Sequence, residues 1–318
     1  MVNEFEFINN IKSRYRLNKV GDDCAVLPKD ADTDLLLTAD LLIEDIDFRL
    51  EWTTPELLGH KALAVSLSDI AAMGGDATSA MLSIGVPAAL WESDFLDRFY
   101  DGWSALAQLF GVELVGGDIS RSPDRLVIDS VAIGEVKRGK AVFRSTAKPG
   151  DAIFVSGTLG GAAGGLKLLE RGFRYTPEET SSGSELIKYQ FYVLPELRLA
   201  NCLHLHEIAT AAIDVSDGLS SDLQHICDAS GVGARIDLGS LPVNSLLRDH
   251  FTPEECEEFV LNGGEDFVLL FTARREHTAL PNDLSVTKIG HITAQSGQIE
   301  LIRQGESNVL RPKGFRHF

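Results

Sequence analysis

The chain has 318 residues, enough for two domains that each bury a core. Its 47 acidic and 29 basic side chains give a formal net charge of −18, which argues against general nucleic-acid binding because such binding rests on Lys and Arg neutralising phosphates. No apolar run approaches the roughly 20 residues that cross a bilayer, and the acidic start lacks the order of a signal peptide. The 4 cysteines show no C-x-x-C spacing, so we expect neither a zinc site nor a disulfide framework, as is usual in the cytoplasm. We therefore expect a cytoplasmic protein without a membrane partner.

The first half alternates strand-like runs with two long helices. Apolar runs at 24–27 and 34–42 predict strands. Thr53-Thr54-Pro55 predicts a helix start with a Thr cap, and this helix ends at Gly74-Gly75. A strand over 79–86, a second helix over 91–110, and strands over 112–115 and 126–136 separated by a Gly116-Gly117-Asp118 turn complete this half.

A basic segment divides the chain. Residues 137–150 hold Lys and Arg side chains and no acid, and both a solvated linker and a grip on nucleotide phosphate fit this composition. We therefore expect an N-terminal domain over 1–137, a linker over 138–150 and a C-terminal domain over 151–318. The C-terminal part predicts strands at 152–155, 211–215, 233–238, 267–271, 285–292 and 298–302, with helices near 195–206, 216–229 and 253–261. Both halves mix strands and helices, so the predicted class is α/β or α+β.

Aspartates recur at the ends of apolar runs, beside Gly, Ser or Thr. The pair Asp22-Asp23 stands behind Gly21, and the others are Asp40, Asp69, Asp118, Asp214 and Asp217. One such Asp alone is more often a turn former or a helix cap, and Asp217 fits a cap. The recurrence favours a site for several Mg²⁺ ions that handles polyphosphate, because Mg²⁺ prefers carboxylate and phosphate oxygens.

Other motifs carry less information. The glycine-rich stretch Gly157–Gly165 fits a phosphate cradle at a helix start, but it lacks the Walker A order, and close packing of a Gly/Ala helix is the stronger interpretation. We find no Ser/His/Asp arrangement that would indicate nucleophilic catalysis.

Several motifs together resemble the thiamine-monophosphate kinase family, which belongs with aminoimidazole-ribonucleotide synthetase and selenophosphate synthetase. The resemblance spans nearly the full length in the family's order. The matching stretches are GDDCAVL (21–27), TADLLIEDIDF (38–48), KALAVSLSDIAAMGG (61–75), VGGDISR (115–121), FRSTAKPGD (143–151), AIDVSDGLSSDL (212–223), NGGEDF (262–267) and GFRHF (314–318).

This resemblance implies an ATP- and Mg²⁺-dependent phosphotransferase that converts thiamine monophosphate to thiamine diphosphate by direct in-line transfer. It also implies a homodimer whose N-terminal domains pair into a shared β-barrel, with the active site between the two domains of the chain. By position, the implied metal contacts are Asp23, Thr38, Ala39, Asp40, Asp69, Asp118, Asp214 and Asp217. The implied ATP contacts are Gly117, Asp118, Arg144 and Ser216, and the implied catalytic residues are Asp69, Asp118, Asp214 and Arg144. Substrate contacts would come from Asp47, Glu265 and Phe315.

Two positions depart from the family pattern. Asp47 stands where members carry a substrate-contacting His, so an Asp would face the substrate there. Ala39 replaces a Thr or Ser, which leaves only a main-chain contact to metal.

Two other functions stay open on the sequence. A sister enzyme of the superfamily would phosphorylate another small molecule, although this chain lacks the reactive Cys-Gly segment of selenophosphate synthetase, and its tail and GGEDF match the kinase better than aminoimidazole-ribonucleotide synthetase. A non-catalytic maturation protein would bind nucleotide without turnover, but the full set of acids speaks against it.

Overall fold

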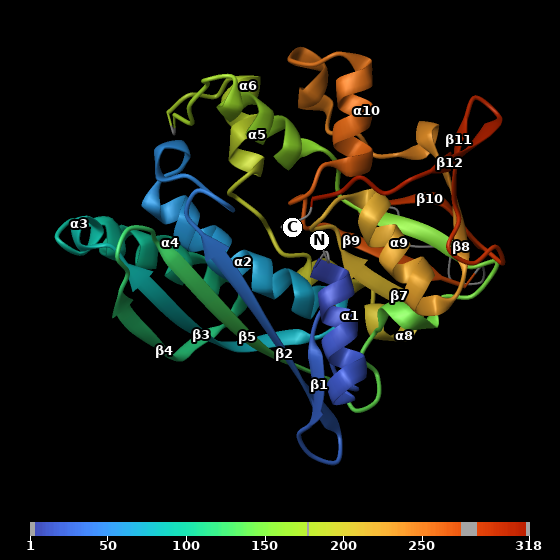
Figure 1. Cartoon of the computed structure of the whole chain (residues 1–318), viewed down its shortest axis with the longest axis horizontal. Helices are drawn as coiled ribbons and strands as arrows, with labels where there is room; N and C mark the ends of the chain where they lie inside the picture. The colour runs from blue at the N-terminus through green and yellow to red at the C-terminus, as the bar shows by residue number, and fades with distance from the viewer. Residues whose placement is uncertain (1–3, 177, 275–284, 316–318) are drawn as a thin grey trace.

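Each half of the chain builds one mixed sheet with helices packed on it, as predicted (Figure 1). The computed structural model describes residues 4–176, 178–274 and 285–315. Residues 316–318 of the expected tail motif lie outside the described residues. Among the described helices, none combines the length and apolar character that crossing a bilayer requires.

The N-terminal sheet has 5 strands in the order β1-β2-β5-β3-β4. Its strands are β1 (Ala25–Pro28), β2 (Thr33–Ile43), β3 (Asp76–Val86), β4 (Glu113–Arg121) and β5 (Val127–Lys137). Only the β3–β4 pair is parallel. Along β2 and β5 buried and less buried residues alternate, so one face of this sheet is covered and the other is not.

Helix α2 (Pro55–Ala72) covers the buried face and lies between the two halves (Figure 1). Its start follows the prediction, because the Thr54 hydroxyl accepts the backbone N–H of Leu57 at 3.3 Å and Pro55 is the first helical residue. Nearly every residue of α2 is buried, since the helix contacts the N-terminal sheet, α4 (Phe95–Phe110), and also β7 of the other half. Helix α1 (Glu4–Tyr15) precedes the first strand.

The C-terminal sheet has 7 strands in the order β12-β11-β8-β10-β6-β9-β7. They are β6 (Ala152–Ser156), β7 (Ala209–Asp214), β8 (Gly233–Asp237), β9 (Leu269–Ala273), β10 (Val286–Thr293), β11 (Ile299–Arg303) and β12 (Glu306–Leu310). Its helices are α5 (Gly161–Glu170), α6 (Ser182–Tyr189), α7 (Leu197–Cys202), α8 (Leu205–Ile208), α9 (Leu219–Ser230) and α10 (Pro253–Asn262). The polar strand β12 was not predicted.

Two predictions in the N-terminal half are wrong. The expected turn at Gly116-Gly117-Asp118 lies inside β4, where Gly117 is needed because a Cβ there would lie 1.9 Å from the carbonyl oxygen of Leu82 on β3. The helix expected over 91–110 is divided into α3 (Ala88–Trp91) and α4, because between them the Ser93 hydroxyl accepts the N–H of Phe95 at 3.2 Å, a local bond that competes with a continuous helix.

Candidate active site

Three aspartates from distant parts of the chain meet where the two halves join. Asp23 lies just before β1, Asp69 in the last turn of α2, and Asp214 at the end of β7. Each offers a carboxylate oxygen, and these atoms lie within 4.8 Å of one another. Asp40 of β2 is their neighbour, since its charge raises the pKa of Asp69. We call Asp23, Asp40, Asp69 and Asp214 the carboxylate cluster.

Hydroxyl groups hold these carboxylates in place. Thr38 donates to Asp69, and Ser68 donates to Asp214 at 2.6 Å. Ser66 donates to Asp40 at 2.7 Å. Ser66 and Ser68 project from α2, which thereby orients acids of both halves. Neither serine was identified from the sequence, although their place beside Asp69 in the matching stretch 61–75 was a signal.

Burial and mutual repulsion make the carboxylate cluster costly to ionise. Burial raises the pKa of Asp214 to about 7 and that of Asp40 to about 6, and the charge of Asp23 adds to both shifts. Burial, followed by the charges of Asp40, Asp214 and Asp23, raises the pKa of Asp69 well above its ordinary value. A cation bound among these groups would remove both penalties.

Arg144 of the basic segment reaches this site. Its guanidinium pairs with Asp23, and its backbone N–H donates to Asp22 at 2.8 Å. Asp22 therefore supports the segment that carries Arg144, while Asp23 is the member of the pair that faces the other acids. Arg144 Nε and Asp23 Oδ2 are both enclosed, with no hydrogen-bond partner among the described residues. Buried polar atoms are normally paired, so an unpaired donor and an unpaired acceptor are expected where bound phosphate and metal supply the partners.

Asp217 belongs to a second acidic group. Its carboxylate, that of Asp222 and a ring nitrogen of His225 lie within 4.8 Å of one another. Asp222 is buried and accepts the N–H groups of Asp217 and Gly218 at 3.2 and 3.0 Å. Asp222 thus shapes the turn that presents Asp217, a role that its place inside an expected helix did not reveal.

Ala39, Gly117 and Asp118 do not meet the carboxylate cluster within one chain. Directly opposed residues in a sheet project on the same face, and the register pairs Asp118 with Ser83, Ser83 with Asp129, and Asp129 with Leu41. The side chains of Asp118 and Leu41 therefore lie on the uncovered face, whereas that of Asp40 lies on the face towards α2. Three inter-strand spacings of about 4.8 Å also separate β4 from β2 by about 14 Å.

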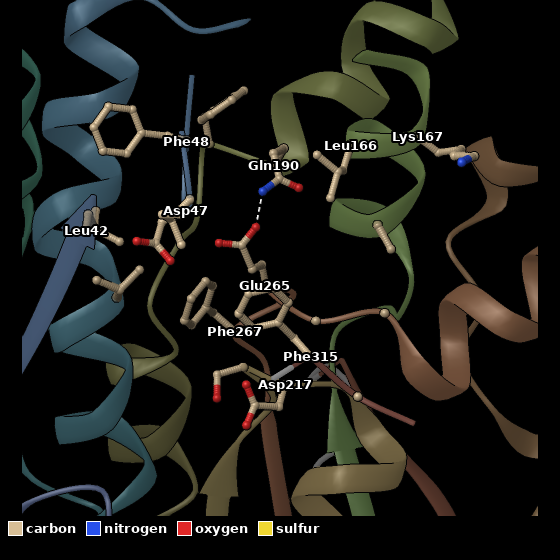
Figure 2. A pocket seen from close by; sticks show the side chains of 18 of the residues that line it. Leu42, Asp47, Phe48, Leu166, Lys167, Gln190, Asp217, Glu265, Phe267 and Phe315 are labelled. Carbon is tan, nitrogen blue, oxygen red and sulfur yellow. Dashed lines mark hydrogen bonds between the residues drawn. The ribbon is translucent and has the colours of Figure 1, made fainter. Parts of the chain in front are cut away.

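A cleft of about 680 Å³ lies between the two halves, and Asp40 is the member of the carboxylate cluster that lines it. Asp47, Ser216, Glu265 and Phe315 line it, so the structure brings the three expected substrate contacts to one cavity (Figure 2). Asp47 is fixed by the backbone N–H of Ile43, which donates to its carboxylate at 2.8 Å. The tail reaches the cleft because the N–H of Phe315 donates to the carbonyl of Asp217 at 3.2 Å.

Glu265 is held by two residues that the sequence did not reveal as functional. Lys61 of α2 is fully buried, and its Nζ lies 2.6 Å from Oε1 of Glu265. Gln190, at the end of α6, donates from Nε2 to Oε2. We call Lys61, Gln190 and Glu265 the Glu265 network. A lysine among the many apolar residues of a helix expected to be buried was the available signal for Lys61.

The glycine-rich stretch before α5 is not a phosphate cradle. Asp266 occupies the start of this helix and accepts the N–H groups of Gly160 at 2.6 Å and of Ala162 at 3.2 Å. This carboxylate fills the place that an anion would take. Gly165 allows close packing, since a Cβ there would lie 2.3 Å from the carbonyl oxygen of Leu186.

Comparison with known proteins agrees with this geometry. Residues 21–136 match the AIR synthase related protein N-terminal domain, and residues 148–302 match the corresponding C-terminal domain. The thiamine-monophosphate kinase of Bacillus subtilis (strain 168) is 34% identical over 100% of both chains. That of Escherichia coli (strain K12) is 37% identical over 99% of this chain and 98% of its own.

Solved structures give the same result. A structure described as AaThiL complexed with AMPPCP and TMP superposes with a TM-score of 0.88 at 33% identity, covering 100% of this chain and 97% of the other. A thiamine-monophosphate kinase from Stenotrophomonas maltophilia K279a gives 0.79 at 36% identity, covering 96% and 98%. The fold, the motifs and these relatives together show that the chain belongs to the thiamine-monophosphate kinase family of AIR synthase related enzymes.

Proposed function

We propose that the protein transfers the γ-phosphoryl group of ATP directly to the phosphate of thiamine monophosphate, giving thiamine diphosphate and ADP in an Mg²⁺-dependent reaction. The names of the relatives and the complex with AMPPCP and TMP support the choice of substrates. The observation that carries the proposal is the buried carboxylate cluster, whose member Asp40 also lines an interdomain cleft.

The residues present fit Mg²⁺. Their donors are hard oxygens, Asp23 Oδ2 has no partner among the described residues, and the raised pKa values show that negative charge is poorly compensated. The carboxylate cluster would hold the metal, with Thr38 beside it and Asp217 facing the same cleft. Bound Mg²⁺ would offset the negative charge that gathers on the phosphates during transfer.

The protein's own groups then orient the reactants. A phosphate nucleophile is already ionised at neutral pH, so transfer needs no general base. Arg144 would donate to a phosphate oxygen through its free Nε, and Ser216 would contact the nucleotide from the wall of the cleft. Alignment of the two phosphates and electrostatic stabilisation would supply the rate enhancement.

The far part of the cleft suits a positively charged aromatic ligand. The aromatic rings of Phe267 and Phe315 and the carboxylate of Asp47 lie together in the cleft (Figure 2). Aromatic faces and a carboxylate both attract a cationic ring such as the thiazolium of thiamine monophosphate. Asp47 would therefore attract the positive charge of the thiazolium ring.

We infer that a second copy of the chain completes the site. The uncovered face of the N-terminal sheet carries exposed apolar side chains, with Leu41 and Met81 exposed by 54% and 41%. Pairing two such faces would bury them in a shared barrel. Asp118 and Gly117 of one copy would then reach the nucleotide and metal beside Ala39 and Asp40 of the other copy. The position of the Asp118 side chain on the uncovered face favours this arrangement.

A turnover assay tests the proposed function. The purified protein with ATP and Mg²⁺ is offered thiamine monophosphate, thiamine, formylglycinamidine ribonucleotide or selenide, and ADP and products are quantified. We expect thiamine diphosphate and ADP in equal amounts from thiamine monophosphate alone. Turnover of another compound without turnover of thiamine monophosphate would refute the proposal.

A further inference from the structure

The amide group of Gln190 lies in the wall of the cleft. This side chain is 3% exposed, and its Nε2 donates to Glu265. Its Oε1 is enclosed and has no hydrogen-bond donor among the described residues. Figure 2 shows this oxygen turned towards Leu166, whose side chain has no donor to offer. A buried carbonyl oxygen is normally paired, so this one calls for a donor that a ligand supplies.

The orientation of the amide is fixed by its surroundings. Reversing the amide would place its oxygen against a carboxylate oxygen of Glu265, which is repulsive and donates nothing. Glu265 cannot turn away, because its other oxygen lies 2.6 Å from the ammonium group of Lys61. The contacts within the Glu265 network therefore fix the orientation of the acceptor atom, Oε1 of Gln190.

The Glu265 network also carries no net charge. Lys61 is fully buried and its positive charge is matched by Glu265, so this corner gives a cationic ring no electrostatic advantage. Glu265 nevertheless keeps a backbone φ of 66°, a conformation that costs energy for a residue with a side chain. The strained backbone of Glu265 and the neutral charge of the Glu265 network together favour recognition of a neutral polar ring through hydrogen bonds.

We propose that Gln190 is a specificity-determining residue whose Oε1 accepts a hydrogen bond from the exocyclic amino group of the substrate's neutral pyrimidine ring. This inference rests on the proposed function, since thiamine monophosphate joins such an aminopyrimidine to its cationic thiazolium. The two rings are then distinguished by different parts of one cleft. Asp47 and the aromatic side chains act on the charged ring, and the Glu265 network acts on the neutral one.

The test compares thiamine monophosphate with oxythiamine monophosphate, in which oxygen replaces the amino group. Binding of each is measured by calorimetry and turnover by ADP release, for wild type, Gln190→Met and the matched control Gln108→Met on the exposed side of α4. We expect wild type and the control to prefer the amino compound by at least about tenfold. Gln190→Met should reduce this preference to within about threefold by weakening binding of thiamine monophosphate.

Each outcome decides a separate question. Wild type that does not phosphorylate thiamine monophosphate refutes the proposed function. Wild type that does so while Gln190→Met keeps the full preference for the amino compound overturns the role of Gln190. An equal loss for both compounds also overturns it, because it indicates a structural role. Should Gln190→Met fail to fold in thermal unfolding, Gln190→Asn, which withdraws the amide by one methylene, is judged by the same ratio.

Discussion

The two ends of the cleft handle buried charge in opposite ways. The carboxylate cluster gathers four acids, of which Asp23 pairs with Arg144, and burial and repulsion raise the pKa values of Asp40 and Asp214 to about 6 and about 7. In the Glu265 network, one buried lysine faces one carboxylate at 2.6 Å, and an amide holds the other oxygen. In the proposed function, uncompensated charge suits the first end to metal and phosphate, and compensated charge suits the second end to recognition through shape and hydrogen bonds.

The largest expected effect comes from removing one acid of the carboxylate cluster. Asp69→Asn should lower kcat at least about 1,000-fold, because a central ligand is lost. Its metal-free form should unfold at the same or a higher temperature, because a repelled buried charge is removed. Steady-state kinetics and thermal unfolding measure both, with the exposed Asp101→Asn on α4 as the control. Activity near wild type would mean that the carboxylate cluster is structural.

Mixing two inactive variants tests whether this end is shared between copies. Asp118→Asn and Asp69→Asn should each be inactive, but mixed dimers would contain one site with both residues intact. After the two are unfolded and refolded together, we expect activity of about one quarter of wild type from random pairing. No recovery, with dimers confirmed by sedimentation, would place Asp118 in its own copy's site, and full activity of Asp118→Asn by itself would place Asp118 outside any site.

The Glu265 network should respond through substrate binding. Lys61→Met leaves Glu265 without its counter-ion and should raise KM for thiamine monophosphate by about tenfold or more, with a smaller change in kcat. The double variant Lys61→Met/Glu265→Gln should recover thermal stability, because no unpaired charge remains, but not KM. A fall in kcat with KM unchanged would contradict the assignment of this end to recognition.

Asp47 should have a smaller effect. Asp47→Asn keeps the shape and removes the charge, so we expect KM for thiamine monophosphate to rise about three- to tenfold while kcat changes little. The neighbouring Asp45→Asn, whose carboxylate pairs with Arg125 at 2.6 Å, is the matched control. Equal effects of the two variants would show that Asp47 has no particular role.

The smallest effect is a pH dependence of stability. Asp40 and Asp214 have ordinary pKa values of 3.8 that burial raises to about 6 and about 7 in the folded protein. The folded state therefore binds more protons than the unfolded state between these values, and metal-free stability falls as pH rises from about 4 to about 7. Mg²⁺ binds the deprotonated acids, so its gain in Tm should be a few degrees larger at pH 8 than at pH 5.5. An equal gain at both pH values would contradict this linkage.

Local patterns predicted much of the fold. Alternation and caps predicted most helices and strands, as at Thr54 and Pro55, because these signals depend on neighbours in the chain. They failed at Gly116–Asp118, where glycine allows close approach to β3 and makes no turn, and at Gly157–Gly165 they left open a phosphate cradle that Asp266 fills, beside the close packing that Gly165 confirms. In both cases the deciding partner lies far away in the sequence.

The sequence by itself determined the family, through its ordered motifs, and a set of candidate acids. Only the tertiary structure decided which acids share a site, that Asp118 projects on the opposite face of the sheet from Asp40, and that Lys61 neutralises Glu265 from 204 positions away. Residue type and spacing specify what a side chain can bind. Burial, charge compensation and the face on which it projects depend on contacts between segments that composition and periodicity do not encode.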